Sequence, residues 1–217
     1  MIKVSMRDIA IYGASGFGRE IACTIGLINK VEPTLNYIGF FDDGMEKGTE
    51  VQYGKVLGGM GELNEWKEPL SVCFAIGDAL VLKDLVGKIT NALVDFPNII
   101  APSVLLLDAN TVQMGMGNVI CANSLISCNV RLGNFNLLNV YTHMGHESVM
   151  GDFNVVMPGC SISGGVVIGN GNLFGAKSVV LQYKRVGNEV TLSPGSVLAR
   201  NAHDGKVYLG NPAKVFM

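Results

Sequence analysis

The chain has 217 residues, a formal net charge of −2, and hydrophobic residues at 48% of its positions, but charged residues at only 16%. This length allows one large domain or two small ones with a buried core, and the small net charge gives no electrostatic basis for binding nucleic acid or an anionic membrane. The 28 glycines are spread along the chain, which favours many turns over a flexible linker.

The cysteines and the N-terminal residues exclude several further classes. The five cysteines are odd in number and none forms a Cys-x-x-Cys pair, so we expect neither structural zinc nor a disulfide framework. The first residues are charged before they become apolar, unlike a signal peptide, and no apolar run is long enough to span a bilayer. We therefore expect a cytoplasmic protein without a nucleic-acid or membrane partner.

The first half begins with a glycine-rich turn between an apolar run and a helical pattern. Residues 9–12 predict a buried strand, and residues 19–27 have the spacing of a helix. The turn between them holds the candidate substrate-binding residues Gly13, Ser15, Gly16, Phe17 and Gly18. A turn at this place presents backbone N–H groups to a phosphate.

Two further apolar runs, residues 37–41 and 72–76, predict strands of the same small parallel sheet, and residues 79–93 predict a helix. The residues that end these strands are further candidates for substrate binding: Asp42, Asp43, Gly77 and Asp78. Acidic side chains at this place can bind sugar hydroxyls, although the same turns can be purely structural. A domain of about 100 residues suits a mononucleotide or a nucleotide sugar better than NAD, because a full dinucleotide fold uses six strands.

The second half of the chain repeats every six residues. Stepping by six from Met114 to Leu198 meets a large apolar residue each time, and an apolar–glycine pair recurs every eighteen residues, beginning with Met114-Gly115. Six residues make a short strand and a corner, so three such units close a triangular coil with one inward side chain on each face. We attribute the repeated glycine to a corner whose backbone angles other residues resist.

This period predicts a solenoid over residues 106–202. Antiparallel strands with regular turns are the alternative, but they would alternate strictly and turn every eight to twelve residues. Stacked coils need covered ends, and we assign this role to the first domain, residues 1–105, and to the tail, residues 203–217. The pattern leaves the hand of the solenoid open, since parallel crossovers are normally right-handed.

Five segments in this order resemble the sugar acyltransferase family that contains bacterial sialic-acid O-acetyltransferases and UDP-amino-sugar N-acetyltransferases. The matching segments are residues 11–20, 39–43, 75–78, 145–153 and 210–214, so the resemblance covers nearly the whole chain. It implies an α/β, Rossmann-like N-terminal domain for a nucleotide sugar or free sugar, followed by a left-handed parallel β-helix. It also implies a homotrimer with acetyl-CoA in the groove between subunits.

The resemblance further implies roles for individual residues. His146 matches the catalytic histidine, and Glu147 matches the acidic residue that orients it. Gly164 resembles the glycine whose N–H faces the thioester oxygen. The remaining expected contacts of acetyl-CoA are Ala176, Pro194 and Lys214. The chain departs from many relatives at Ala101 and Val155, where a histidine is common.

Acyl transfer to an amine or alcohol needs a base that removes a proton, and an imidazole does this near neutral pH. The chain has three histidines, His143, His146 and His203, and no recognisable Ser or Cys nucleophile motif, so we expect direct transfer with no metal. A γ-class carbonic anhydrase needs three histidine ligands and is excluded, because only two histidines lie in the repeats. These residues do not separate N-acetylation from O-acetylation, but the nucleotide-binding type of first domain favours N-acetylation of a nucleotide-linked amino sugar in surface glycan or polysaccharide synthesis. O-acetylation of a sugar such as sialic acid is the alternative, and a non-catalytic sugar-nucleotide binding protein is the alternative from another class.

Overall fold

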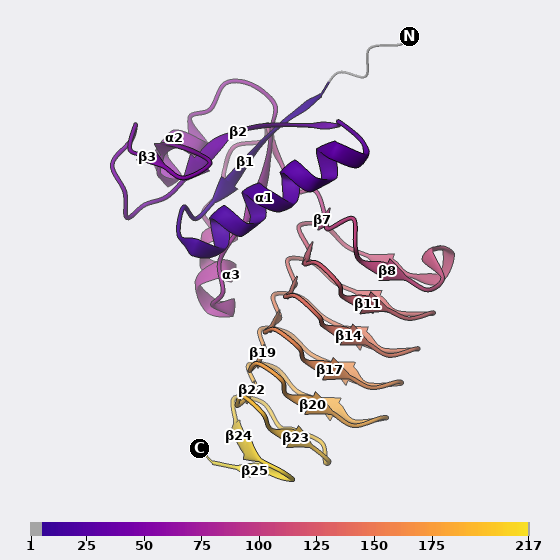
Figure 1. Cartoon of the computed structure of the whole chain (residues 1–217). Helices are drawn as coiled ribbons and strands as arrows, with labels where there is room; N and C mark the ends of the chain where they lie inside the picture. Colours follow the sequence, from indigo (N-terminus) through magenta and orange to yellow (C-terminus); the bar gives the residue numbers. More distant parts are fainter. Residues whose placement is uncertain (1–5, 217) are drawn as a thin grey trace.

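The computed structural model describes residues 6–216, which form an α/β domain followed by a triangular solenoid (Figure 1). The first domain contains a six-stranded sheet in the order β3-β4-β2-β1-β5-β6, and only the β3–β4 pair is antiparallel. Its strands are β1 (Arg7–Tyr12), β2 (Leu35–Phe41), β3 (Glu50–Val51), β4 (Gly54–Gly58), β5 (Leu70–Phe74) and β6 (Val94–Asp95). The predicted parallel sheet is confirmed.

Three helices accompany this sheet: α1 (Gly16–Val31), α2 (Met60–Asn64) and α3 (Ala79–Gly87). The prediction of a helix over residues 79–93 is wrong in its second half, because α3 ends at Gly87. Beyond it, the side-chain amide of Asn91 donates to the carbonyl oxygens of Leu63 and Trp66, at 3.0 and 2.8 Å. A turn held by such distant partners leaves no periodic signal in the local sequence.

The solenoid is a left-handed parallel β-helix with three faces, each a sheet of short strands that pair in parallel, except for the antiparallel β24–β25 pair at the end of face 1. Face 1 contains β7 (Ile99–Ile100), β10 (Val119–Ile120), β13 (Leu137–Leu138), β16 (Val155–Val156), β19 (Leu173–Phe174), β22 (Thr191–Leu192) and the terminal β24 (Val207–Gly210) and β25 (Ala213–Val215). Face 2 contains β8 (Leu105–Leu106), β11 (Leu125–Ile126), β14 (His143–Met144), β17 (Ser161–Ile162), β20 (Val179–Val180) and β23 (Val197–Leu198). Face 3 contains β9 (Gln113–Met114), β12 (Arg131–Leu132), β15 (Val149–Met150), β18 (Val167–Ile168) and β21 (Arg185–Val186). We name the corners 1–2, 2–3 and 3–1 after the faces that they join.

The predicted frame of six forms the core of this β-helix. Each residue of the frame from Ile120 to Leu198 is the second residue of a strand and is at most 4% exposed, and Met114 is half-buried. Because these side chains stack coil upon coil, one continuous apolar column fills the prism. The solenoid prediction is confirmed.

The β-helix nevertheless begins before residue 106, the start expected from the sequence. Strands β7 and β8 already lie in faces 1 and 2, and each pairs with the strand of the next coil. A 3₁₀ turn at Ala109–Thr111 lengthens the corner between β8 and β9. This corner holds two residues more than the later ones, so Ile100 and Leu106 fall outside the frame counted from Met114.

The corners show why glycine recurs every eighteen residues. Every sixth residue from 117 to 195 has a φ between 53° and 72°, but the repeated glycines are not among these residues. A Cβ on Gly133 would instead lie 2.2 Å from Oδ1 of Asp152 and 2.7 Å from the carbonyl oxygen of Gly151. The prediction that these glycines supply special backbone angles is wrong: they are required because successive coils approach too closely for a side chain.

A ladder of buried asparagines joins the coils at corner 3–1. The side-chain amide of Asn136 donates to Oδ1 of Asn118, that of Asn154 to Asn136, and that of Asn172 to Asn154, at 2.8–3.0 Å. Each Oδ1 also accepts the backbone N–H of the residue eighteen positions later, ending at Val190. The four side chains are at most 1% exposed, so these bonds satisfy polar groups that would otherwise be costly to bury.

The first domain packs along face 1 and not only over the end of the solenoid. The outward side chains of Val119, Leu137 and Val155 share a core with Ile9 and Ile11 of β1. Val155 is fully buried there, so the position where many relatives carry a second histidine lies beneath the first domain.

At the other end of the solenoid, β24 pairs with β22 and β25 turns back along β24, with Tyr208 and Ala213 buried against the apolar column. Across residues 6–216, no helix has the length and apolar character needed to cross a bilayer.

Candidate active site

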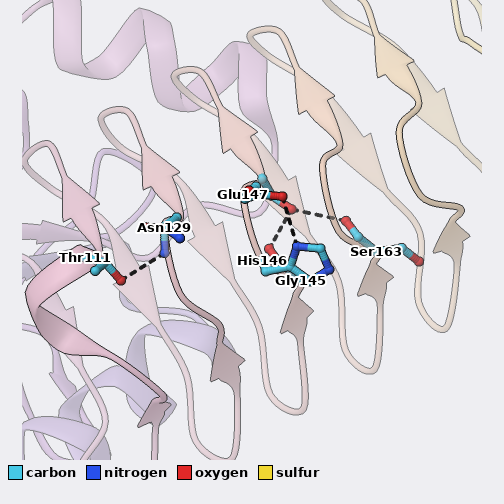
Figure 2. Close-up of polar contacts among 7 residues, drawn as sticks. Thr111, Asn129, Gly145, His146, Glu147 and Ser163 are labelled. Carbon is cyan, nitrogen blue, oxygen red and sulfur yellow. Dashed lines mark hydrogen bonds and ion pairs between the residues drawn. The ribbon is translucent and has the colours of Figure 1, made fainter.

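His146 and Glu147 lie together in corner 2–3, between β14 and β15 (Figure 2). Nδ1 of His146 is 3.3 Å from Oε2 of Glu147, and the two side chains are 54% and 63% exposed. A carboxylate can only accept a hydrogen bond, so this contact places the proton on Nδ1 and leaves a lone pair on Nε2. This is the tautomer that a general base needs.

The backbone of this corner is held by the coils on both sides. Glu147 has a φ of 58°, and its N–H donates to the carbonyl oxygen of Cys128 at 3.1 Å. The carbonyl oxygen of His146 accepts the N–H of Gly165 at 2.8 Å. Because these bonds fix the peptide units around His146, its side chain leaves the corner in a defined direction.

Gly164 occupies the matching position of the next coil, directly against the imidazole. A Cβ on Gly164 would lie 2.5 Å from Nε2 and 2.6 Å from Cε1 of His146. The Gly164 N–H makes no hydrogen bond to any other residue in the described range 6–216. A proton acceptor and a backbone donor therefore lie side by side, which suits a reaction that builds negative charge on a carbonyl oxygen.

Ser148 supports this corner and was not predicted. Its buried hydroxyl lies 2.7 Å from the carbonyl oxygen of Gly145 and 3.1 Å from that of Ser163 in the next coil. The sequence did hold a signal, because the positions eighteen residues before and after Ser148 are Val130 and Val166. Lys184 is the next polar residue at this corner position, but it is partly exposed, so Ser148 is the polar residue that is buried there.

The remaining candidate acetyl-CoA contacts lie elsewhere on the prism. Ala176 and Pro194 are in corner 1–2, where Gly175 packs directly against Pro194, so face 2 separates them from His146 within the chain. Lys214 lies on β25 and lines a cleft of about 340 Å³ together with Arg200 and His203. Of the four candidate acetyl-CoA contacts, the structure therefore places Gly164 alone next to His146 within one chain.

The other histidine of this coil, His143, has a different setting. His143 lies on the outer side of face 2, with Nδ1 3.3 Å from Oγ of Ser161 in the next coil. Among residues 6–216, no cluster of three or more His, Cys, Asp or Glu side chains is placed to hold a metal ion.

The three predicted substrate-binding loops come together at the carboxyl ends of β1, β2 and β5, which are neighbours in the sheet. The Gly13 N–H donates to the carbonyl oxygen of Phe41 at 2.7 Å, and a Cβ on Gly13 would lie 3.0 Å from the carbonyl oxygen of Ala75. The loops that follow the three strands therefore form one surface, as expected of a ligand cleft in a parallel sheet.

Both predicted carboxylates bind groups of these loops. Asp42 accepts the N–H of Ala14 at 2.8 Å and that of Gly44 at 2.9 Å. Asp43 accepts the hydroxyl of Tyr12 at 2.5 Å and the N–H of Met60 at 2.8 Å. Burial, followed by this hydrogen bond to Asp43, raises the pKa of Tyr12 far above its ordinary value.

Four other candidates of these loops divide into residues that the fold needs and residues that it does not. Gly18 is required, because a Cβ there would lie 1.9 Å from the carbonyl oxygen of Gly13, and Phe17 packs against the core. The side chain of Ser15 makes no hydrogen bond at the start of α1, and Gly16 has only a distant arginine nitrogen near its Cβ position. Ser15 and Gly16 are thus free to meet a ligand.

The third loop shows the same division. Asp78 caps α3 by accepting the N–H groups of Leu80 and Val81, at 2.9 and 3.0 Å. A Cβ on Gly77 would meet nothing within 4 Å, and its φ is not in the left-handed range. The fold therefore does not explain a glycine at position 77. A ligand group, such as a phosphate, that lies close to the main chain at this place would explain it.

Comparisons with known proteins match both parts of the chain. The model of the PglD N-terminal domain matches residues 8–89, and that of the bacterial transferase hexapeptide matches residues 147–182. GDP-perosamine N-acetyltransferase of Escherichia coli O157:H7 is 27% identical over 82% of this chain and 79% of its own length. The acyl-[acyl-carrier-protein]–UDP-N-acetylglucosamine O-acyltransferase of Pseudomonas paraeruginosa is 28% identical over 38% of this chain. The matched stretch covers 32% of the length of that relative.

A solved structure resembles nearly the whole chain. The acetyltransferase domain of PglB from Neisseria gonorrhoeae, in complex with acetyl coenzyme A, superimposes with a TM-score of 0.87 at 25% identity and covers 98% of this chain and 100% of its own. The order of a PglD-type domain and hexapeptide coils, together with a histidine–glutamate pair in a coil corner, leads to one conclusion. In the order of its two parts and in its fold, the chain is similar to the sugar acyltransferases of the left-handed β-helix, hexapeptide-repeat type.

Proposed function

We propose that the chain transfers an acetyl group from acetyl-CoA to the amino group of a nucleotide-linked amino sugar used in surface glycan synthesis. The observation that carries this proposal is Nε2 of His146 lying over Gly164, whose N–H has no acceptor among the described residues. The likeness to GDP-perosamine N-acetyltransferase over 82% of the chain supports an amine as the acceptor.

In the proposed reaction, the amine nitrogen attacks the thioester carbonyl carbon, and Nε2 of His146 accepts the proton that the amine loses. The Gly164 N–H donates to the oxyanion of the tetrahedral intermediate. Collapse of this intermediate breaks the carbon–sulfur bond, and the protonated imidazole returns its proton to the leaving coenzyme A sulfur. Glu147 stabilises the imidazolium through Nδ1, as the carboxylate of a catalytic triad does.

Acetyl-CoA would lie along corner 2–3, towards the C-terminal end. Arg200 occupies the position of His146 three coils later, and strands of adjacent coils are about 4.8 Å apart, which places it roughly 14 Å along the same corner. The cleft that Arg200 shares with His203 and Lys214 then lies where an extended coenzyme would bring its phosphates. Basic side chains at this place favour phosphate binding.

A homotrimer with active sites between subunits completes this arrangement. The first domain covers face 1, whereas His146 lies in corner 2–3, so the sugar-binding loops and the base of one chain face different directions. The proposed acetyl-CoA contacts are likewise divided between corners 1–2 and 2–3. A threefold assembly that places corner 1–2 of one subunit against corner 2–3 of the next joins both halves of the site.

The function is tested with a panel of GDP-, UDP-, dTDP- and CMP-linked sugars, each with an amine or only hydroxyls at the accepting position. We expect thiol release and a mass gain of one acetyl group with an amino sugar, from a protein whose mass in light scattering is that of three chains. Transfer only to hydroxyl sugars would instead establish an O-acetyltransferase, and no transfer to any sugar would contradict the proposal.

Replacing Asp42 tests the sugar-binding loops. Asp42→Ala removes the carboxylate that holds Ala14 and Gly44, and with it a charge-assisted bond to the acceptor. We expect the acceptor KM to rise about ten- to a hundredfold, because such a bond contributes about 1.5–3 kcal/mol. The acetyl-CoA KM and kcat should change little, since these loops are remote from the reacting atoms. Lower thermal stability with an unchanged acceptor KM would show that Asp42 only holds the loop.

A further inference from the structure

Tyr141 is an exposed aromatic residue in an unfavourable backbone conformation. It lies in corner 1–2 with a φ of 59°, and its side chain is 65% exposed. Within residues 6–216, its hydroxyl makes no hydrogen bond and its ring pairs with no other aromatic ring. The left-handed conformation is unfavourable for a residue with a Cβ, and glycine or asparagine adopts it more readily. The neighbouring coils use those residues at this position, Asn123 and Gly159.

In the corners of the β-helix, two other aromatic residues in this conformation, Tyr183 and Phe135, gain packing that Tyr141 lacks. A Cβ on Gly165 would lie 2.5 Å from the ring of Tyr183, and one on Gly117 would lie 2.4 Å from the ring of Phe135. Each of these rings therefore covers a bare glycine of the preceding coil. The residue eighteen positions before Tyr141 is Asn123, not glycine, so the chain itself does not explain a tyrosine at this corner.

The place of Tyr141 relative to His146 offers a reason for a tyrosine at this corner. Tyr141 and His146 belong to the same coil and lie at opposite ends of β14. We consider a trimer in which corner 1–2 of one subunit meets corner 2–3 of the next and equivalent coils lie at the same height along parallel solenoid axes. In this arrangement, Tyr141 of one subunit lies beside His146 of its neighbour. The proposed coenzyme contacts Gly164 and Ala176 occur only in later coils, so Tyr141 lies on the side from which the acceptor enters.

We propose that Tyr141 contacts the acceptor sugar in the active site of the neighbouring subunit, with its ring against the sugar and its hydroxyl as a hydrogen-bonding group. This inference rests on the proposed acetyl transfer and on the trimer. It assigns to corner 1–2 a residue that determines acceptor binding and that acts only between chains.

The first test separates binding from stability. Tyr141→Asn should raise the acceptor KM about tenfold, leave the acetyl-CoA KM unchanged and leave thermal stability equal or higher, because asparagine tolerates a positive φ. Tyr141→Phe should show a smaller rise. Tyr53→Asn is the matched control: Tyr53 is exposed with a φ of 76° in the turn between β3 and β4, so it should change stability in the same direction without changing either KM.

The second test mixes subunits. Trimers assembled from equal amounts of His146→Ala and Tyr141→Asn chains are assayed at an acceptor concentration well below the wild-type KM. If Tyr141 acts across the interface, about a quarter of the sites combine an intact histidine with an intact tyrosine from the next chain. Activity should then exceed that of either parent trimer. If Tyr141 acts within its own chain, no site is restored and activity should fall below that of the Tyr141→Asn trimer.

The outcomes separate this inference from the proposed function. An active wild-type enzyme and an inactive His146→Ala variant, combined with a mixed trimer weaker than the Tyr141→Asn parent, would overturn the role of Tyr141 alone. An unchanged acceptor KM in Tyr141→Asn would do the same. Absence of acetyl transfer by the wild-type protein would instead overturn the proposed function.

Discussion

His146→Ala should lower kcat about a hundred- to ten-thousandfold, which is the usual contribution of a positioned general base. The loss follows from removing Nε2, the lone pair that faces Gly164. The free energy of unfolding should change by less than about 0.5 kcal/mol, because the side chain is exposed and does not support the core. Steady-state kinetics and thermal unfolding of the purified variant measure both quantities.

A graded variant accompanies this test. Glu147→Gln keeps the imidazole and the length of the side chain but removes the charge that stabilises the imidazolium, so its kcat should fall less than that of His146→Ala. Turnover near the wild-type value in a folded His146→Ala protein would refute the mechanism.

Gly164→Ala should reduce kcat about a hundredfold, because a displacement of roughly 1 Å at a reacting group can cost this much. The added Cβ would lie 2.5 Å from Nε2 of His146, so the imidazole must move away. The backbone tolerates alanine, since the φ of Gly164 is outside the left-handed range. The acceptor KM should remain near that of the wild type, as the sugar-binding loops are untouched.

Gly26→Ala in α1 is the matched control for Gly164→Ala. A Cβ on Gly26 meets nothing within 4 Å, so the variant should retain full activity and gain some stability from better helix propensity. Equal kcat values for the two alanine variants would contradict the prediction, because they would show that catalysis by His146 does not require the free space at Gly164.

The sequence predicted those parts of the fold that repeat. The inward residues from Ile120 to Leu198 are apolar because each must fill the prism, and this demand recurs at a fixed spacing. The first two strands of the β-helix, β7 and β8, were not predicted. The turn at Ala109–Thr111 adds two residues before β9, so the inward residues of β7 and β8 do not fall on the six-residue spacing counted from Met114. The hairpin of β3 and β4 was also missed, since it is short and turns through Tyr53 with a φ of 76°.

The candidate site was predictable where its partners are adjacent in the sequence. His146 and Glu147 are neighbours, so their contact follows from one corner of the chain. The bonds of Asp42 to Ala14 and of Asp43 to Tyr12 join residues about thirty positions apart, and no spacing rule shows them. Resemblance, not periodicity, identified Gly164.

The buried ladder from Asn118 to Asn172 has a consequence for how this protein can change its length. Each amide binds its counterpart eighteen residues away, so a deletion of any other size within the coils would leave buried donors and acceptors unpaired. Insertions and deletions in the β-helix are therefore restricted to whole coils, or to loops that bulge outward. The turn at Ala109–Thr111, which lies before the ladder, is such a loop. Inserting a copy of residues 155–172 would extend all three faces in register and add one corner of each kind, which gives engineers a unit for moving the C-terminal cleft relative to His146.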